Sequence, residues 1–155
     1  MGFVRDLARG KLGEQTFVNW LSQYNIPSKK IEGVSGDIQF DINGKTLTAE
    51  VKYDEKSLIT GNIAIEYMNS RKNALSGILS SLANFWIYVL PYEGSNTIWC
   101  ADRLKLLQFV TNTKPFRIFE NAGDGNANIF LYKKDNILNV VFQPISQEIF
   151  LTYEN

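Results

Sequence analysis

The sequence of 155 residues predicts a single domain with an α+β fold, built on a mixed central sheet flanked by helices. Three observations predict it. Apolar residues recur at helical spacing near the N-terminus, the next segments alternate between polar and apolar residues, and a later run is apolar throughout. These patterns are typical of a surface helix, of half-buried strands and of a central strand, respectively.

The first predicted element is a helix over residues 12–24, with Pro27 just beyond its end. A strand over residues 37–42 follows, because its apolar residues all fall on one face. Asn43-Gly44 is the strongest short signal for a hairpin turn, so the chain is expected to return as an antiparallel strand that ends at Tyr53.

The later elements follow from the same patterns. In order, they are a strand over 62–67, a short helix over 73–83 preceded or broken near Ser76-Gly77, a buried strand over 85–90, a strand over 97–100, a helix capped by Asp102, and a hairpin of residues 129–132 with 137–142. The first six elements therefore have the order α-β-β-β-α-β.

Composition restricts the possible chemistry. The chain contains no histidine, which excludes catalytic triads and histidine-based zinc sites. Cys100 is the single cysteine, so neither an intrachain disulfide nor a thiolate zinc cluster can form. Sixteen basic and sixteen acidic residues give a net charge of zero, which argues against broad electrostatic capture of nucleic acid but not against local patches. The longest apolar run, residues 85–90, is far shorter than the roughly 20 residues of a membrane span, and we expect a soluble, cytoplasmic protein.

The predicted hairpin brings charged residues together. A two-residue turn at Asn43-Gly44 places Asp37 directly opposite Glu50, with Lys52 further along the same face. Like charges facing each other across strands are destabilising unless a cation lies between them. Oxygen ligands at this separation suit Mg²⁺ or Mn²⁺.

Glu14 is a second carboxylate in an unusual position, after the facing pair on the hairpin. It shares the apolar stripe of the first helix with Phe17, Val18 and Leu21. A buried, unpaired carboxylate costs several kcal/mol, on the order of the penalty for burying a polar group. A helix packed on the polar end of the hairpin would bring Glu14 towards Asp37. Two interpretations stay open: a site made by these groups, or a solvated hairpin face with Glu14 at the rim of its stripe.

The residues also resemble a known family. Ser35-Gly36-Asp37 followed by Glu50-Val51-Lys52 resembles the motif of the PD-(D/E)XK nuclease superfamily, and Lys11-Leu12-Gly13-Glu14 looks like its N-terminal helix, which often donates an extra acid. The resemblance covers about residues 11–90. It is closest to small Holliday junction resolvases and to phage or intron-encoded (homing) endonucleases. Gly36 stands where the family has proline.

This resemblance implies a restriction-endonuclease-like αβββαβ core and a metal-dependent DNA endonuclease. The metal, Mg²⁺ or Mn²⁺, would be held by Asp37, Glu50 and the Val51 carbonyl, with Lys52 as the catalytic lysine and Glu14 as the additional catalytic acid. The substrate would be duplex or branched DNA, cut by a homo-oligomer, either a dimer or a tetramer. A different class stays open: a catalytically silent DNA-binding or interaction domain with a nuclease-like core.

Other residues are weaker candidates. The expected nucleic-acid contacts are Arg9, Lys11, Asn69, Arg71 and Lys72. Glu66 is either a supporting acid near Glu50 and Lys52 or, more often for this residue type, a solvent-facing side chain. Residues 97–155 exceed what the core needs and are expected to serve an interface or DNA contacts.

Overall fold

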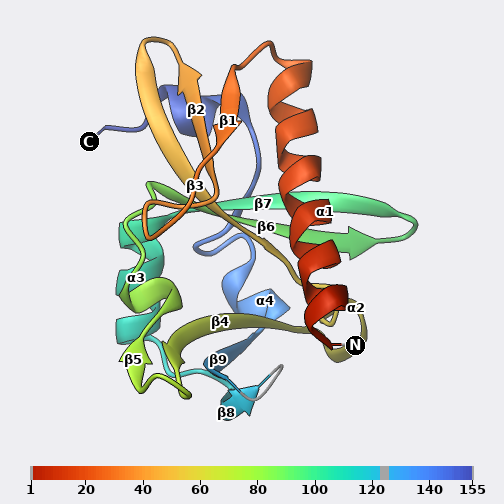
Figure 1. Cartoon of the computed structure of the whole chain (residues 1–155), viewed down its shortest axis with the longest axis vertical. Coiled ribbons are helices and arrows are strands. Elements are labelled where there is room, and N and C mark those ends of the chain that lie inside the picture. The colour runs from red at the N-terminus through yellow and green to blue at the C-terminus, as the bar shows by residue number, and fades with distance from the viewer. Residues whose placement is uncertain (1, 123–125, 155) are drawn as a thin grey trace.

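The computed structural model describes residues 2–122 and 126–154, with side chains from residue 8 onward. Within these residues the chain forms a six-stranded sheet of order β1-β2-β3-β6-β7-β10 and a four-stranded sheet of order β5-β4-β9-β8 (Figure 1). The larger sheet is mixed, because β3 and β6 run parallel whereas its other neighbours are antiparallel. The predicted α+β class with a mixed central sheet is confirmed.

The N-terminal elements are α1 (Gly2–Gln23), β1 (Ser28–Lys30), β2 (Ile38–Ile42) and β3 (Lys45–Tyr53). The helix predicted over residues 12–24 is confirmed, although it begins ten residues earlier and ends one residue earlier. It packs along β3 (Figure 1). Phe17 and Leu21 are fully buried, and the Phe17 ring meets that of Phe40 edge-on at 5.7 Å.

The hairpin has the predicted register. Ile38 pairs with Ala49 and Ile42 with Lys45, which leaves Asn43 and Gly44 as the two turn residues. Both have positive φ, 50° and 78°, as a tight hairpin turn requires. The local sequence therefore sets the alignment of β2 with β3, and the position of Asp37 follows from it.

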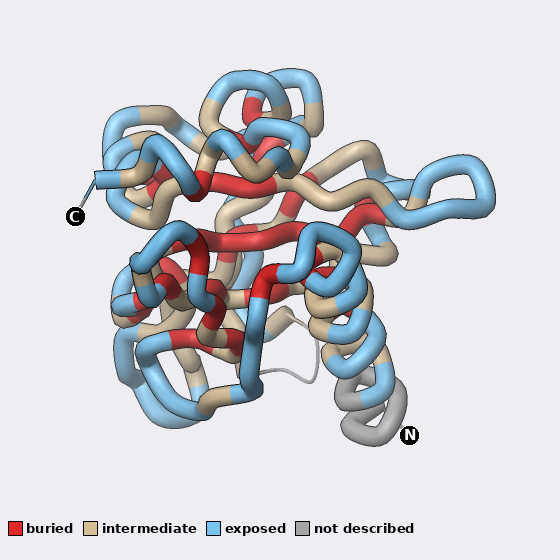
Figure 2. Tube along the Cα trace, turned by 90° about the horizontal axis from the view of Figure 1, so that it is seen from above, coloured by how far each residue is buried: buried red, intermediate tan, exposed pale blue. Residues whose placement is uncertain are grey.

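Strand β6 (Phe85–Tyr92) lies between β3 and β7 (Ser95–Asp102) and separates two hydrophobic cores. Phe85, Ile87 and Val89 belong to the core beneath α1, whereas Trp86, Tyr88 and Leu90 belong to the core shared with the second sheet. The buried segments in Figure 2 trace these cores. The prediction of a strand covered on both faces is confirmed.

The segment between β3 and β6 differs from the prediction. The strand predicted over residues 62–67 is confirmed as β4 (Asn62–Asn69), which belongs to the second sheet. The helix predicted over 73–83 is wrong: the chain forms β5 (Ala74–Leu75) and the short 3-10 helix η1 (Gly77–Leu79). Ser76 is extended and Gly77 has φ of 52°, and this pair breaks the helical path. A four-residue helix, α2 (Ser57–Thr60), precedes β4.

The C-terminal part completes both cores. Its elements are α3 (Arg103–Asn112), β8 (Arg117–Ala122), β9 (Ala127–Lys133), α4 (Lys134–Ile137), β10 (Gln143–Pro144) and α5 (Gln147–Leu151). The Asp102 cap is confirmed: its carboxylate accepts hydrogen bonds from the backbone N–H groups of Leu104 and Lys105 at 2.9 and 3.2 Å.

The hairpin predicted from residues 129–132 and 137–142 is wrong. Strand β9 pairs with β4 and β8, while the chain turns into α4 directly after it. Ile137 faces the second core from this helix, so its apolar pattern reflects burial and not strand pairing. Phe150 of α5 is fully buried against the rings of Phe40 and Phe85, each 4.9 Å away. Over residues 2–122 and 126–154, no helix combines the length and the apolarity needed to cross a membrane.

Candidate active site

Asp37 directly precedes β2 and lies beside β3. Its N–H donates to the Ala49 carbonyl at 2.8 Å, and its Oδ2 accepts the Val51 N–H at 2.9 Å. These two bonds hold the carboxylate against the stretch of β3 that carries Glu50 and Lys52. The paired residues of β2 and β3 begin at Ile38 and Ala49, so the direct pairing of Asp37 with Glu50 stays a prediction.

Gly36 stands where the motif that the sequence resembles has proline. Its φ is 125°, a conformation that proline cannot adopt because its ring fixes φ near −65°. A Cβ at this position would lie 2.7 Å from the Ala49 carbonyl oxygen. Glycine at position 36 therefore allows the backbone before Asp37 to pass close to the Ala49 carbonyl of β3.

Glu14 approaches the same region from α1. Gly13 permits this, because a Cβ there would already lie 3.1 Å from the Cβ of Tyr53 on β3. The Glu14 side chain is 17% exposed, and Lys30 Nζ lies 3.7 Å from its Oε1. Burial, and then the charge of Asp37, raise the pKa of Glu14 above its ordinary value. The helix therefore delivers a third carboxylate next to Asp37.

Glu50 and Lys52 form an ion pair on β3, with 3.2 Å between Glu50 Oε1 and Lys52 Nζ. Burial raises the pKa of Glu50, and the charge of Asp37 adds to this against the opposing effect of Lys52. Burial by itself lowers the pKa of Lys52, but Glu50, Glu66 and Asp37 together outweigh it, so the pKa of the ammonium is raised. Lys52 Nζ also lies 5.7 Å from the Trp86 ring centroid.

The charge of Asp37 raises the proton affinity of both Glu14 and Glu50, which is the situation that a bound cation relieves. In the part of the chain that the structure describes, no three acidic side chains are arranged to enclose a metal ion by themselves. The predicted ligand set is smaller: two carboxylates, from Asp37 and Glu50, and the backbone carbonyl of Val51, whose side chain is in the core. Mg²⁺ commonly binds to one or two carboxylates and completes its shell with water and substrate phosphate, so these residues fit it.

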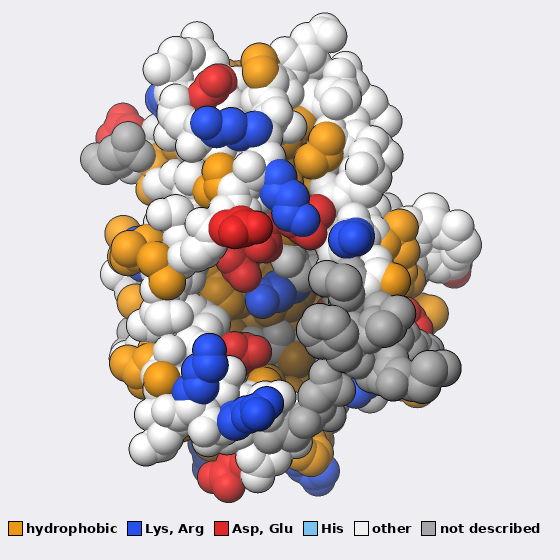
Figure 3. Space-filling model, in the orientation of Figure 1, with side chains coloured by type: hydrophobic (Ala, Val, Ile, Leu, Met, Phe, Trp, Pro, Cys, Tyr) orange, Lys and Arg blue, Asp and Glu red, His pale blue; other side chains and the backbone are white. Residues whose placement is uncertain are grey.

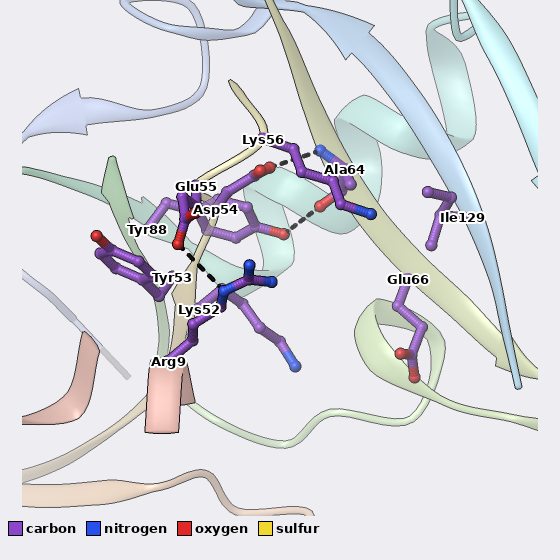
Figure 4. A pocket seen from close by; sticks show the side chains of 10 residues that line it. All are labelled: Arg9, Lys52, Tyr53, Asp54, Glu55, Lys56, Ala64, Glu66, Tyr88 and Ile129. Atoms are coloured by element: carbon purple, nitrogen blue, oxygen red, sulfur yellow. Dashed lines mark hydrogen bonds and ion pairs between the residues drawn. The ribbon is translucent and has the colours of Figure 1, made fainter. Parts of the chain in front are cut away.

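A cavity of about 250 Å³ opens beside Lys52 (Figure 4). Tyr88 donates its hydroxyl to the Ala64 carbonyl at 2.6 Å, and Asp54 accepts the Ala64 N–H at 3.2 Å, so this wall of the cavity is tied to β4. Arg9, predicted as a DNA contact, also lines the cavity and pairs with Glu55 at 3.1 Å.

Glu66 lines the same cavity, although sequence analysis favoured a solvent-facing position for it. It reaches the site from the second sheet, and its charge affects the pKa values of both Glu50 and Lys52. The alternation of β4 predicted the face on which Glu66 lies. Nothing local predicted that the second sheet would bring that face to Lys52.

Basic residues flank the carboxylates (Figure 3). A hollow of about 380 Å³ between α1 and β1 is lined by Lys11, Lys29, Lys30 and Glu14. Of the other predicted contacts, Arg71 and Lys72 are exposed in the turn between β4 and β5. Asn69 accepts the Lys72 N–H at 3.1 Å, so its side chain shapes this turn.

No protein-family model, curated protein or solved structure matches this chain.

Proposed function

We propose that this chain is a metal-dependent DNA endonuclease of the PD-(D/E)XK type. The observation that carries the proposal is the convergence of Asp37, Glu50 and Lys52 on the β2–β3 hairpin, with Glu14 added from α1. Convergence of like charges on a rigid scaffold is unfavourable for stability alone and is common at catalytic sites. In a chain without histidine, carboxylates and lysine are the groups able to support phosphodiester hydrolysis.

The residues take the following roles. Asp37, Glu50 and the Val51 carbonyl would hold Mg²⁺ or Mn²⁺, and the ion, when bound, would supply Lewis-acid chemistry for phosphodiester hydrolysis. Glu14 accepts a hydrogen bond from the attacking water or supports the ligands. Lys52, kept charged by its acidic neighbours, stabilises the negative charge that develops on the phosphoryl oxygens.

The arrangement of elements supports a restriction-endonuclease-like core. Helix α1 and strands β1, β2 and β3 are followed by a crossover to β6, which pairs parallel with β3. This order is αβββ-crossover-β. Its three strands before the crossover are β1, β2 and β3, whereas the sequence-based order counted β4 as the third strand. The crossover carries α2, β4, β5 and η1 where the expected core has one helix.

Duplex or branched DNA is the proposed substrate, because the lysine-lined hollow adjoins the carboxylates and Arg71 and Lys72 are exposed on a separate turn. The described part of the chain carries one such site, and cutting both strands is most simply done by two related copies. We therefore propose a homo-oligomer, a dimer or a tetramer, acting on DNA in the cytoplasm.

Cleavage of supercoiled plasmid in Mg²⁺, with EDTA as the blank, tests the proposal. The variants Asp37→Ala and Lys52→Ala should lose activity by at least about 100-fold, since each removes a group that acts on the transition state. Asp41→Ala is the matched control, because Asp41 is an exposed carboxylate on the same hairpin.

Cleavage that persists in both site variants would refute the site. Absence of cleavage on any DNA would favour the catalytically inactive nuclease-like domain. Comparing a four-way junction with linear duplexes of mixed sequence distinguishes a resolvase-like from a homing or restriction-like enzyme.

A further inference from the structure

Glu66 occupies a place that the nuclease motif does not account for. It comes from β4 of the second sheet, yet it lines the cavity beside Lys52 of the central sheet (Figure 4). We propose that Glu66 is a positioning residue that holds the Lys52 ammonium in its working position. The inference rests on the proposed function and concerns how this chain orients its catalytic lysine.

The backbone around Glu66 is shaped to aim this side chain. The pairing of β4 with β9 shifts register between Glu66 and Met68, which is a β-bulge. Bulges redirect side chains and are frequent near active sites. Gly77 then packs directly on the Glu66 backbone: its φ is 52°, and any Cβ there would overlap the Glu66 carbonyl. The position of Glu66 is thus fixed from two sides.

The Glu66 carboxylate is also oriented. Ser76 Oγ donates to its Oε2 at 2.6 Å, and Glu66 is only partly exposed. One oxygen is therefore held by Ser76, while the carboxylate as a whole carries its charge next to the cavity.

The charges around Lys52 explain why a second carboxylate is needed there. Lys52 Nζ pairs with Glu50 Oε1 at 3.2 Å, but Glu50 is also a proposed metal ligand. A carboxylate that binds a cation attracts an ammonium less strongly. Glu66 is outside the proposed ligand set, so it is free of the metal and restrains Lys52 when Glu50 is engaged. Glu66 and Lys52 line the same cavity from the two sheets, so the carboxylate is placed to face the ammonium across it.

A purely structural role is the competing explanation: Glu66 would anchor Ser76 and do nothing for Lys52. The two differ in whether Glu66 and Lys52 are energetically coupled. A double-mutant cycle of Glu66→Gln and Lys52→Met, read as the Tm of the metal-free protein, measures this coupling without reference to activity. The Tm loss of the double variant should fall short of the sum of the two single losses by about 2 °C or more.

Glu120→Gln combined with Lys52→Met is the matched control, since Glu120 is an exposed acid on β8 of the same sheet. Its Tm shifts should add. Additive shifts for Glu66→Gln with Lys52→Met would overturn the proposal, whether or not the protein cleaves DNA.

Steady-state cleavage then tests the consequence for catalysis. Glu66→Gln should lower kcat about 10- to 100-fold with KM within about twofold, because substrate binding is untouched while the lysine loses its orientation. Glu66→Asp should restore part of the rate, and Glu120→Gln, an exposed acid on β8 of the same sheet, should behave as wild type. Wild-type kcat in Glu66→Gln would overturn the positioning role. A wild-type protein that cleaves no DNA would instead refute the nuclease proposal and leave the Tm cycle interpretable.

Discussion

Gly36 offers a direct test of how the site is built. Replacing it with alanine imposes two penalties on the folded state. A side chain at φ of 125° is strained by about 1–3 kcal/mol. The new Cβ also lies 2.7 Å from the Ala49 carbonyl oxygen, a backbone atom that cannot move without disturbing β3. We expect a total loss of about 2–5 kcal/mol, which for a chain of this length lowers Tm by about 5–15 °C.

Gly33 is the matched control. Its φ is 95°, but nothing lies within 4 Å of the position that a Cβ would take. Gly33→Ala therefore carries the backbone strain without the clash, and Gly10→Ala, inside α1 with open space around it, carries neither and should stabilise slightly. Thermal unfolding followed by circular dichroism ranks the three variants.

Equal Tm losses for Gly36→Ala and Gly33→Ala would refute the claim that close approach to Ala49 positions Asp37. Gly36→Pro, which restores the residue of the family motif, is expected to lose at least as much stability as Gly36→Ala, because φ near −65° is incompatible with this turn.

Three further predictions concern the DNA surface, the core and the carboxylates. Alanine at both Lys29 and Lys30 should reduce the slope of log DNA affinity against log salt by up to about 2, since each DNA phosphate that a lysine no longer neutralises lowers the slope by about 0.9. Lys105→Ala on α3 should leave the slope unchanged. Fluorescence anisotropy across a salt series measures the slope. Phe150→Ala should lower the free energy of unfolding in urea by about 3–5 kcal/mol. Leu151→Ala should lower it far less, because Leu151 is 43% exposed. Equal losses would refute the claim that Phe150 anchors α5 in the core. The pKa of Glu14 is raised in the folded chain, so the stability that the protonated Glu14 carboxyl contributes is present below the ordinary pKa of 4.5 and is lost as pH rises through the folded pKa. Between pH 4 and 7, the metal-free wild type should therefore lose more stability than Glu14→Gln. Parallel profiles of unfolding free energy against pH would contradict this.

The parts of the molecule that could be predicted from sequence are those set by local geometry. The register of β2 with β3 follows from a two-residue turn and an alternating pattern, so the approach of Asp37 to the stretch of β3 that carries Glu50 could be derived without a structure. The same is true of the Asp102 cap and of β6, whose unbroken apolar run reflects burial on both faces.

The parts that could not be predicted depend on long-range pairing. Strand β4 has an ordinary alternating pattern, and nothing in it specifies β9 as its partner, 58 to 71 positions away by the paired residues Asn69–Ala127 and Asn62–Lys133. The position of Glu66 in the site follows from that pairing. The wrong helix over 73–83 has a similar origin, because the contact of Gly77 with the Glu66 backbone overrides local helical preference.

Strand β6 has a consequence for how the molecule unfolds. Alternate residues of this one strand supply Phe85, Ile87 and Val89 to one core and Trp86, Tyr88 and Leu90 to the other. Neither the layer that carries α1 nor the second sheet can detach without uncovering one face of β6, so local opening on either side is coupled to the other. The amides of β6 should therefore be the slowest to exchange with solvent, and both halves should share a single cooperative transition. The geometry of a site assembled from both sheets is protected by that cooperativity.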